Sequence, residues 1–159
     1  MKILSYAKEI KKIIKKHKTV FITGHKSLDL DAIGSSLGVY SIVKKFNRQA
    51  HIIVDDETLE LGVKKLIDDQ KEINFIKSKD INKLETSSNL LIIVDTNKSN
   101  LLSNEDLINV FDDIIIIDHH QLNDKTIKKG LKVVDDEISS TCEIITNLIN
   151  TYKVNISNQ

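Results

Sequence analysis

The sequence of 159 residues contains no proline and no tryptophan, and it has one cysteine, one methionine and only 4% aromatic residues. Without proline, turns have to be made by glycine, asparagine, aspartate and serine. The lone cysteine, Cys142, excludes an internal disulfide framework. No apolar run approaches the roughly 20 residues that a membrane-spanning helix needs. There is no excess of charge either, because 23 basic residues balance 23 acidic ones. This balance argues against a protein whose main role is to coat nucleic acid or an anionic membrane.

The amino-terminal stretch is rich in lysine and differs from a secretory signal peptide, which has a short charged segment and then an apolar block. Ile3, Ala7, Ile10 and Ile14 recur at helical spacing, which predicts a surface helix with a solvated lysine face. A membrane-surface helix is the alternative, but the aromatic anchors typical of such helices are missing. We expect a cytoplasmic protein, or the cytoplasmic portion of a membrane protein if the chain is a fragment of a longer one.

The chain alternates short apolar runs with helical patterns. A composition of 40% hydrophobic and 29% charged residues suits one soluble globular domain, spanning residues 1–159. Continuous runs of isoleucine and valine are typical of strands buried on both faces of a parallel sheet. We therefore predict an α/β fold, a three-layer α/β/α arrangement with a mainly parallel sheet of about five strands. The strand candidates are residues 19–23, 50–54, 73–76, 90–94, 114–117 and 131–134, the last as an edge strand, and the helix candidates are residues 3–17, 31–46, 58–69 and 140–152.

Acids and histidines follow three of the most apolar strands. Because ligands in open α/β sheets bind beyond the carboxyl ends of the strands, these residues are expected to share one crevice. So many carboxylates together are costly unless a cation lies among them. Mixed imidazole and carboxylate ligands suit Mn, Fe, Zn or Co, and the large share of oxygen ligands favours Mn. The residues are His25, Asp29, Asp31, Asp95, Asp118, His119 and His120, whereas His17 and His51 fall outside the cluster and are predicted to be surface histidines.

Each of these features also has a purely structural interpretation. An acid at a strand end is often a helix cap or a turn former, and Asp31 is a candidate cap for the helix that follows it. Gly34 and Gly38 suit a close approach of that helix to the sheet, and Ser35 with the helix start also suits a phosphate. Ser140 and Glu143 fit a capping box, with contact between a substrate and Ser139 or Ser140 as the alternative, and Cys142 suits a small buried residue better than a ligand.

Four segments in this order resemble the DHH phosphoesterase family. They are residues 24–35 (GHKSLDLDAIGS), Val94-Asp95-Thr96, Asp118-His119-His120 and Ser139-Ser140-Thr141. The wording of the first segment and of residues 95–99 (DTNKS) is closest to the branch that cleaves cyclic di-AMP. The neighbouring branch contains nanoRNases, which also remove the 3′-phosphate from 3′-phosphoadenosine 5′-phosphate.

The resemblance implies a role for each matched residue. His25 and Asp29 would hold one Mn²⁺, Asp31 and His119 would hold the other, and Asp95 would bridge the two. The resemblance also implies Asp118 as the residue that orients the site and His120 as the residue that faces the scissile phosphate. Ser35, Ser139 and Ser140 are candidate substrate contacts. The implied enzyme is a phosphodiesterase in which two Mn²⁺ (alternatively Co²⁺ or Mg²⁺) activate a water molecule for hydrolysis of a small nucleotide, with no duplex nucleic acid as partner and a homodimer among the expected assemblies.

The chain also departs from the family's pattern. The family continues to a further aspartate ligand and to a carboxy-terminal DHH-associated substrate-binding module, and we find no counterpart of either before Gln159. We therefore expect a catalytic subdomain that is truncated at its carboxy terminus, with weakened metal and substrate binding. The alternative is a domain that binds metal or nucleotide with little activity.

Overall fold

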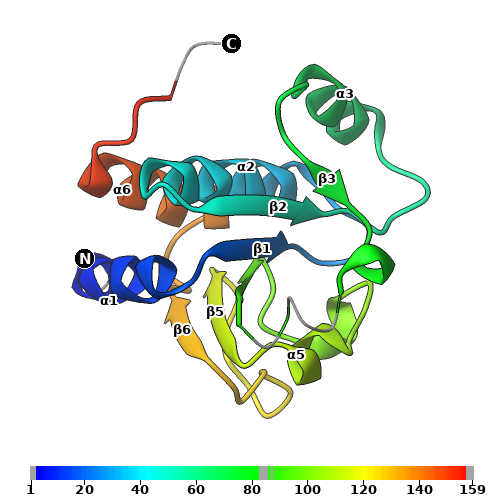
Figure 1. Cartoon of the computed structure of the whole chain (residues 1–159). Coiled ribbons are helices and arrows are strands. Elements are labelled where there is room, and N and C mark those ends of the chain that lie inside the picture. Colours follow the sequence, from blue (N-terminus) through cyan, green and yellow to red (C-terminus); the bar gives the residue numbers. More distant parts are fainter. Residues whose placement is uncertain (1–2, 83–85, 87, 157–159) are drawn as a thin grey trace.

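A six-stranded sheet forms the centre of the molecule (Figure 1). The computed structural model describes residues 3–82, 86 and 88–156. The sheet order is β3-β2-β1-β4-β5-β6, and every registered strand pair is parallel. The parallel α/β sheet is thus confirmed, with six strands where about five were expected. All six overlap the strand candidates, and β6 is an edge strand as predicted. The strands are β1 (Thr19–Thr23), β2 (Gln49–Ile53), β3 (Phe75–Ile76), β4 (Leu90–Val94), β5 (Asp113–Asp118) and β6 (Leu131–Val134).

Helices appear in all four predicted regions. They are α1 (Ile3–Lys16), α2 (Leu30–Lys45), α3 (Leu61–Asp69) and α6 (Thr141–Tyr152). Shorter turns of helix were not predicted, since three or four residues carry no helical periodicity. These are η1 (Ser78–Asp80), η2 (Ser99–Leu101) and α5 (Leu107–Val110). None of the helices in the described residues is both long and apolar enough to cross a bilayer.

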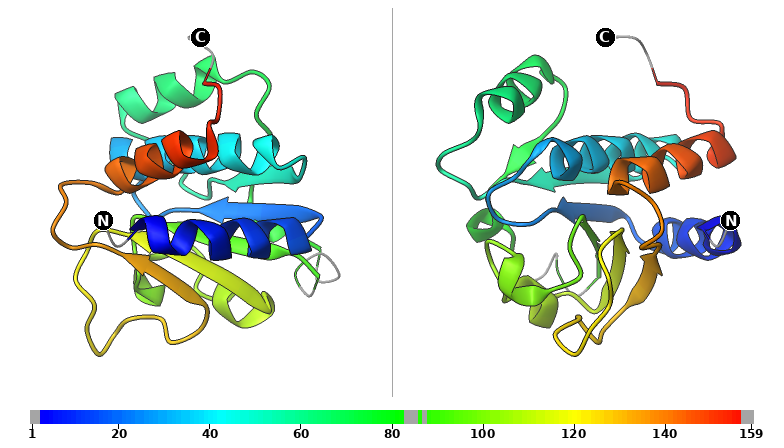
Figure 2. Two further views of the ribbon diagram at one scale, coloured as in Figure 1. Left: turned by 90° about the vertical axis from the view of Figure 1, so that its left-hand side faces the viewer. Right: turned by 180° about the vertical axis from the view of Figure 1, so that it is seen from behind.

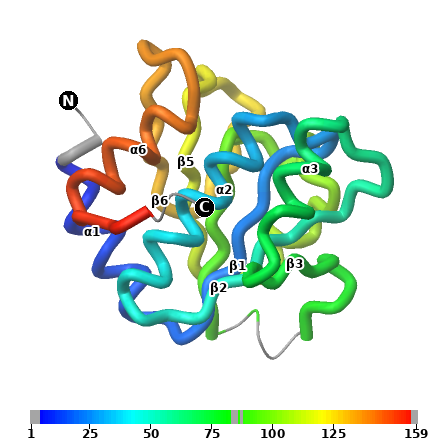
Figure 3. The backbone as a smooth tube through the Cα atoms, turned by 90° about the horizontal axis from the view of Figure 1, so that it is seen from above, coloured from blue at the N-terminus to red at the C-terminus, as the bar shows by residue number. Residues whose placement is uncertain are grey.

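Both faces of the sheet are covered, but unequally. On one face the core joins residues of α1, α2, α3 and α6 to alternate strand residues such as Ile92; Figure 3 shows α6, α2 and α3 in succession across this side. On the other face Leu91 and Ile93 pack against residues of α5 and the loops, including Leu107 and Phe111. The second outer layer therefore consists mainly of loops with one short helix (Figure 2). All of β4 is buried, as its unbroken apolar run predicts.

α1 is a surface helix whose apolar side belongs to the core. Ala7, Ile10 and Ile14 are buried, so its lysines face outward, which confirms the solvated lysine face; the side chain of Ile3 lies outside the described residues. The interpretation of His17 as a surface histidine is wrong: it is 5% exposed. Its Nδ1 pairs with the Ile13 carbonyl and its Nε2 with Asp113, each at 2.9 Å.

The two glycines of α2 mark its crossing with α6. A Cβ at Gly34 would lie 2.9 Å from Cys142 Sγ, and a Cβ at Gly38 would overlap Ile145 Cγ2. The glycines therefore allow close packing, but the partner is α6 and not the sheet, as the sequence had suggested.

The strand order reverses between β1 and β4, because the chain builds outward from β1 through β2 to β3 and then returns to the other side with β4. At such a switch point the connections leave the sheet in opposite directions and open a crevice at the carboxyl ends of the strands. The residues that follow β1, β4 and β5 flank this crevice.

Candidate metal centre

Five of the predicted ligands meet in the crevice, around the buried carboxylate of Asp95. This side chain is 3% exposed and follows β4 directly. Asp95 Oδ2 lies 3.4 Å from His25 Nε2, and Asp95 Oδ1 lies 3.6 Å from His119 Nε2. The two oxygens of one carboxylate thus face imidazoles that come from different loops.

His25, Asp29 and Asp95 form the first group. His25 Nε2 is 3.6 Å from Asp29 Oδ2, and one ligand atom of each of the three residues lies within 4.8 Å of the others. The other ring nitrogen of His25, Nδ1, pairs with the Lys26 carbonyl at 2.8 Å. This contact fixes the ring with Nε2 toward the carboxylates, which is the arrangement usual for metal-binding histidines.

His119 belongs to the second group, together with Asp95 and a third donor. His119 Nε2 lies 3.8 Å from Asp31 Oδ2. One donor atom each of Asp95, His119 and His120 lies within 4.8 Å of the others, and the His119 and His120 rings are 4.2 Å apart between centroids. Asp31 and His120 thus both lie within reach of the position that His119 and Asp95 define.

Asp31 does not cap α2, in contrast to the structural alternative considered above. The cap is Asp29, whose Oδ1 accepts the Ala32 N–H at 2.9 Å. Both oxygens of Asp31 instead accept backbone N–H groups at the start of α6, from Thr141 at 2.9 Å and from Cys142 at 2.8 Å. Burial raises the pKa of Asp31, but the hydrogen bonds from Cys142 and Thr141 outweigh burial and leave that pKa lowered.

The charges of the cluster perturb one another. Burial raises the pKa of Asp95, and the Thr141 hydroxyl, which donates to Asp95 Oδ1 at 2.8 Å, opposes that rise. The hydrogen bond to Asp95 raises the pKa of His25 to about 9. A proton on His25 therefore balances part of the carboxylate charge, and a divalent cation would take over that task.

The donor set fits divalent metal ions. Atoms that share an ion at about 2.0–2.2 Å lie no more than about 4.4 Å apart, and the four imidazole–carboxylate separations, from 3.4 to 3.8 Å, fall within that limit. A carboxylate with one oxygen in each group suits a pair of ions that share it. Imidazole with several carboxylate oxygens is a mixed ligand set that Mn²⁺ accepts.

Asp118 lies behind the cluster and is fully buried. Its Oδ1 contacts His120 Nδ1 at 2.8 Å, and its Oδ2 accepts a hydrogen bond from Asn97 Nδ2 at 2.7 Å. Asn97 also donates to the His120 carbonyl at 3.0 Å and accepts from the Thr126 hydroxyl at 3.1 Å. Asp118 and Asn97 together fix the orientation of the His120 ring, whose side chain is half exposed. Within the described residues, its Nε2 makes no hydrogen bond.

Sequence reasoning missed Asp56, which lies just beyond the end of β2. Its two oxygens accept the N–H groups of Ser27 at 3.1 Å and Leu28 at 3.0 Å. Ser27 has a φ of 58°, a conformation uncommon for residues other than glycine. Asp56 therefore holds the loop between His25 and Asp29; its position after another strand, among several acids, was the available signal.

The three predicted substrate contacts occupy different environments. Ser35 is fully buried in α2 and its hydroxyl donates to Cys142 Sγ at 3.4 Å, so it lies away from the crevice. Ser140 is the N-cap of α6 and its oxygen accepts the Glu143 N–H at 3.2 Å, which confirms the capping prediction. Ser139 is exposed beside that cap.

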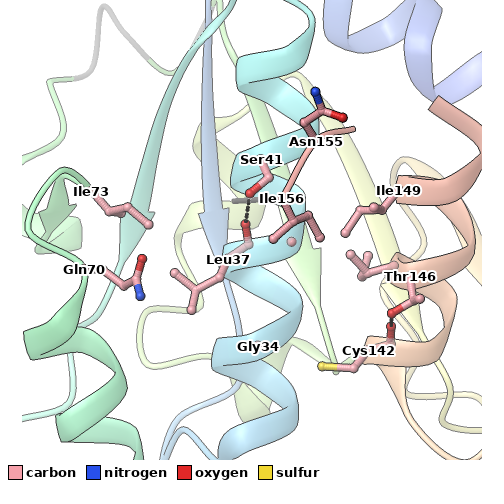
Figure 4. A pocket seen from close by; sticks show the side chains of 12 residues that line it. Gly34, Leu37, Ser41, Gln70, Ile73, Cys142, Thr146, Ile149, Asn155 and Ile156 are labelled. Atoms are coloured by element: carbon pink, nitrogen blue, oxygen red, sulfur yellow. Dashed lines mark hydrogen bonds between the residues drawn. The ribbon is translucent and has the colours of Figure 1, made fainter. Parts of the chain in front are cut away.

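Two hollows lie near these residues. The hollow over the cluster has a volume of about 260 Å³, and its lining includes one lysine, Lys98. A separate hollow of about 390 Å³ lies between α2 and α6, lined mainly by apolar side chains such as Leu37 and Ile149 (Figure 4). The free thiol of Cys142 reaches this second hollow, and burial raises the pKa of the thiol to about 11.

Comparisons with known proteins show the family to which the chain belongs. The family model described as "DHH family, N-terminal domain" matches residues 19–159. The chain is 31% identical over 154 residues to the cyclic-di-AMP phosphodiesterase GdpP of Bacillus subtilis, with 93% of the chain and 23% of that protein covered. It is 31% identical over 145 residues to the cyclic-di-AMP phosphodiesterase PdeA of Listeria monocytogenes, with 87% and 22% covered. The chain thus spans less than a quarter of the length of these two relatives.

Among solved structures, an exopolyphosphatase-related protein from Bacteroides fragilis has a similar fold. The TM-score is 0.77 at 23% identity, over 94% of this chain and 44% of that chain. At this identity the likeness concerns the fold alone.

Proposed function

The chain belongs to the DHH family, and on that premise we propose that residues 1–159 are the metal-binding catalytic part of a phosphodiesterase that hydrolyses cyclic di-AMP. Two relatives at 31% identity carry that activity in their names. A small cyclic dinucleotide also suits a crevice built from three loops better than a duplex would. Cleavage of one P–O bond by water would convert the cyclic dinucleotide into a linear one.

The observation that carries the proposal is the position of Asp95 between two histidines, with one carboxylate oxygen toward each. We assign His25, Asp29 and Asp95 to one ion. Asp95, Asp31 and His119 would hold the other, and Mn²⁺ is the expected metal with Co²⁺ or Mg²⁺ as alternatives. When bound, such ions stabilise negative charge on phosphoryl oxygens and activate water at neutral pH.

The protein's own groups complete the proposed site. Asp118 and Asn97 hold the His120 ring so that its free Nε2 can meet a phosphoryl or leaving oxygen, where a positioned donor stabilises developing charge. Lys98 lines the hollow and would contact a second phosphate of the substrate. Contact of Ser139 with substrate remains a prediction, and the buried Ser35 would reach a ligand only if α2 and α6 moved apart.

Side-by-side assays of cyclic di-AMP, linear pApA and 3′-phosphoadenosine 5′-phosphate test the substrate. With Mn²⁺ present, we expect cyclic di-AMP to be hydrolysed fastest. Faster turnover of either linear nucleotide would instead indicate a nanoRNase or a nucleotide phosphatase. Two bound Mn²⁺ without any turnover would leave a metal-binding domain.

Metal content and activity of variants test the assigned roles. Asp95→Ala should lose both ions, because each group depends on this carboxylate. Asp118→Asn should keep both ions and lose rate, because it orients His120 without belonging to either group. Asp136→Ala, at an exposed acid outside the cluster, is the matched control and should behave as the wild type. Retention of two ions by Asp95→Ala would contradict the bridging role.

A further inference from the structure

A second concentration of charge lies at the amino-terminal ends of the strands, whereas the metal centre lies at their carboxyl ends. The amino-terminal ends of β1 and β2 meet there, since the Gln49 N–H donates to the Lys18 carbonyl at 3.1 Å. Two recesses open at this edge, with volumes of about 380 and 360 Å³, and they share Lys15 and Asn47 as lining residues. We treat the two adjoining recesses as one site and call it the basic hollow. Its lining cations are Lys11, Lys15, Lys16, Lys18, Lys45, Lys153 and Arg48.

Carboxylates are absent from the lining of both recesses in the described part of the chain. Asp113 approaches from one side and pairs with Lys16 at 2.8 Å. Lys11 Nζ lies 5.5 Å from the centre of the Phe46 ring. Within the described residues, the other lining lysines have no carboxylate within ion-pair distance. The chain has no net charge, so this edge is positive because its charges are segregated.

Helix ends account for part of this charge only. Lys15 and Lys16 lie in the last turn of α1, and Lys45 lies in the last turn of α2, where cations stabilise the helix dipole. Lys11 precedes the last turn of α1, and Lys18 follows that helix. Lys153 is the C-cap of α6. Like charges that converge from several elements repel one another, and the helix ends do not explain why Lys11 and Lys18 line the same recesses as the others.

Hydrogen bonds hold the Arg48 guanidinium in place. Arg48 Nη2 donates to the Lys15 carbonyl at 2.8 Å and Nη1 donates to the Asn47 carbonyl at 3.1 Å. Tyr152, which lines one of the recesses, donates its hydroxyl hydrogen to the Ala7 carbonyl at 2.6 Å and ties α6 to α1. A positive group held in place loses less freedom when an anion binds, which favours affinity.

The shape of the hollow selects among anionic partners. None of the exposed large hydrophobic residues of the described chain lines either recess, so a bilayer would find no apolar anchor and would touch only the rim. Each recess has the size of a small-molecule site. We propose that the basic hollow binds a soluble ligand with two or more phosphate groups in a row, of the class of nucleoside polyphosphates or inorganic polyphosphate. This site is separate from the metal centre and does not depend on its chemistry.

Calorimetric titration of the intact chain with inorganic triphosphate, in the presence of a chelator, tests the site. We expect binding that weakens as salt is raised, because exposed charges are screened over about 8 Å at physiological ionic strength. Lys15→Gln should weaken binding about tenfold, the loss of one charge-assisted contact. Asp113→Asn should tighten binding, because it frees Lys16. Lys153→Gln should weaken binding and provides a second variant, should Lys15→Gln fail to fold.

Two controls separate this site from others. The double variant Lys64→Gln/Lys65→Gln removes exposed charges on α3 and should bind triphosphate as the wild type does. Asp95→Asn alters the metal centre and should also leave binding unchanged.

Several results would overturn the proposal. They are the absence of triphosphate binding at low salt, unchanged binding by both Lys15→Gln and Lys153→Gln, and loss of binding in Asp95→Asn. Equal affinity for inorganic monophosphate would overturn the multi-phosphate assignment. Lysine-dependent binding of vesicles rich in anionic lipid, without triphosphate binding, would replace the soluble ligand with a membrane surface.

Discussion

Asp56 should control metal affinity although it belongs to neither ligand group. Its carboxylate accepts the Ser27 and Leu28 N–H groups at 3.1 and 3.0 Å, in the middle of the loop that carries His25 and Asp29. With Asp56→Ala, both donors lose their acceptor, and the loop must be ordered at the expense of binding energy. Residues that orient metal ligands typically contribute about 10–100-fold to affinity, so we expect Mn²⁺ binding to the His25 group to weaken by about that factor.

The neighbouring residue provides the control. Asp55 lies at the same end of β2 and accepts one N–H, from Ser78 at 2.8 Å, which belongs to η1 and not to the ligand loop. Asp55→Ala should therefore cost a similar hydrogen bond and leave Mn²⁺ binding unchanged. Asp56→Asn should fall between wild type and Asp56→Ala, because one amide oxygen can still accept one of the two N–H groups.

Calorimetric Mn²⁺ titrations and the chelated protein's free energy of unfolding together distinguish the two roles of Asp56. The hydrogen bonds are partly solvated, so we expect a loss of only about 1–2 kcal/mol of stability from Asp56→Ala. Normal Mn²⁺ affinity in Asp56→Ala would refute the reasoning. An equal loss of affinity in Asp55→Ala would also refute it, because the effect would then come from general destabilisation.

Three further predictions concern packing, capping and pH. Gly38→Ala should destabilise the chain by about 1–3 kcal/mol, because its Cβ would overlap Ile145 Cγ2; unchanged thermal unfolding would contradict the close packing of α2 on α6. Ser140→Ala should cost about 1 kcal/mol through loss of the α6 cap; a large loss of activity at unchanged stability would indicate substrate contact instead. The Lys16 hydrogen bond lowers the pKa of Asp113 below its usual 3.8. The resulting stability is therefore present above about pH 3.8 and lost as pH falls through the lowered value. Asp113→Asn should be less stable than wild type at neutral pH, by less than about 1 kcal/mol because the pair is exposed. Denaturant unfolding should show this difference vanish in acid.

The sequence predicts the sheet well because its strands carry an unusually plain signal. Residues 19–23, 90–94 and 131–134 match strand bounds in the structure, since apolar runs of this length bounded by polar residues have few alternatives. The sequence predicts the short helices poorly. α5 has four residues, too few for a periodic pattern, and it is stabilised by contacts of Leu107 and Phe111 across the second face of the sheet.

The candidate site divides in the same way. Residues at strand ends were predictable, because parallel strands deliver their carboxyl ends to one edge, and His25, Asp95 and His119 do meet there. The backbone N–H groups that each carboxylate accepts were not predictable. Asp29 and Asp31 are two residues apart in the sequence, and only the structure shows that Asp29 caps α2 while Asp31 receives the N–H groups of α6. Asn97 is similar, because its hydrogen bond to the distant Asp118 leaves no pattern in the sequence. Asp56 follows a strand as the predicted ligands do, but its contacts with the Ser27 and Leu28 N–H groups are visible only in the structure.

The contacts of Asp31 connect α2 with the start of α6. α6 begins about 110 residues after α2, yet its first N–H groups bind the carboxylate that the metal-binding loop supplies, and its Thr141 hydroxyl binds Asp95. The α2–α6 crossing that the two glycines permit therefore sets the distance between Asp31 and Asp95. A change that separates these helices would move one ligand away from the other, so packing remote from the crevice and metal binding within it depend on the same contact.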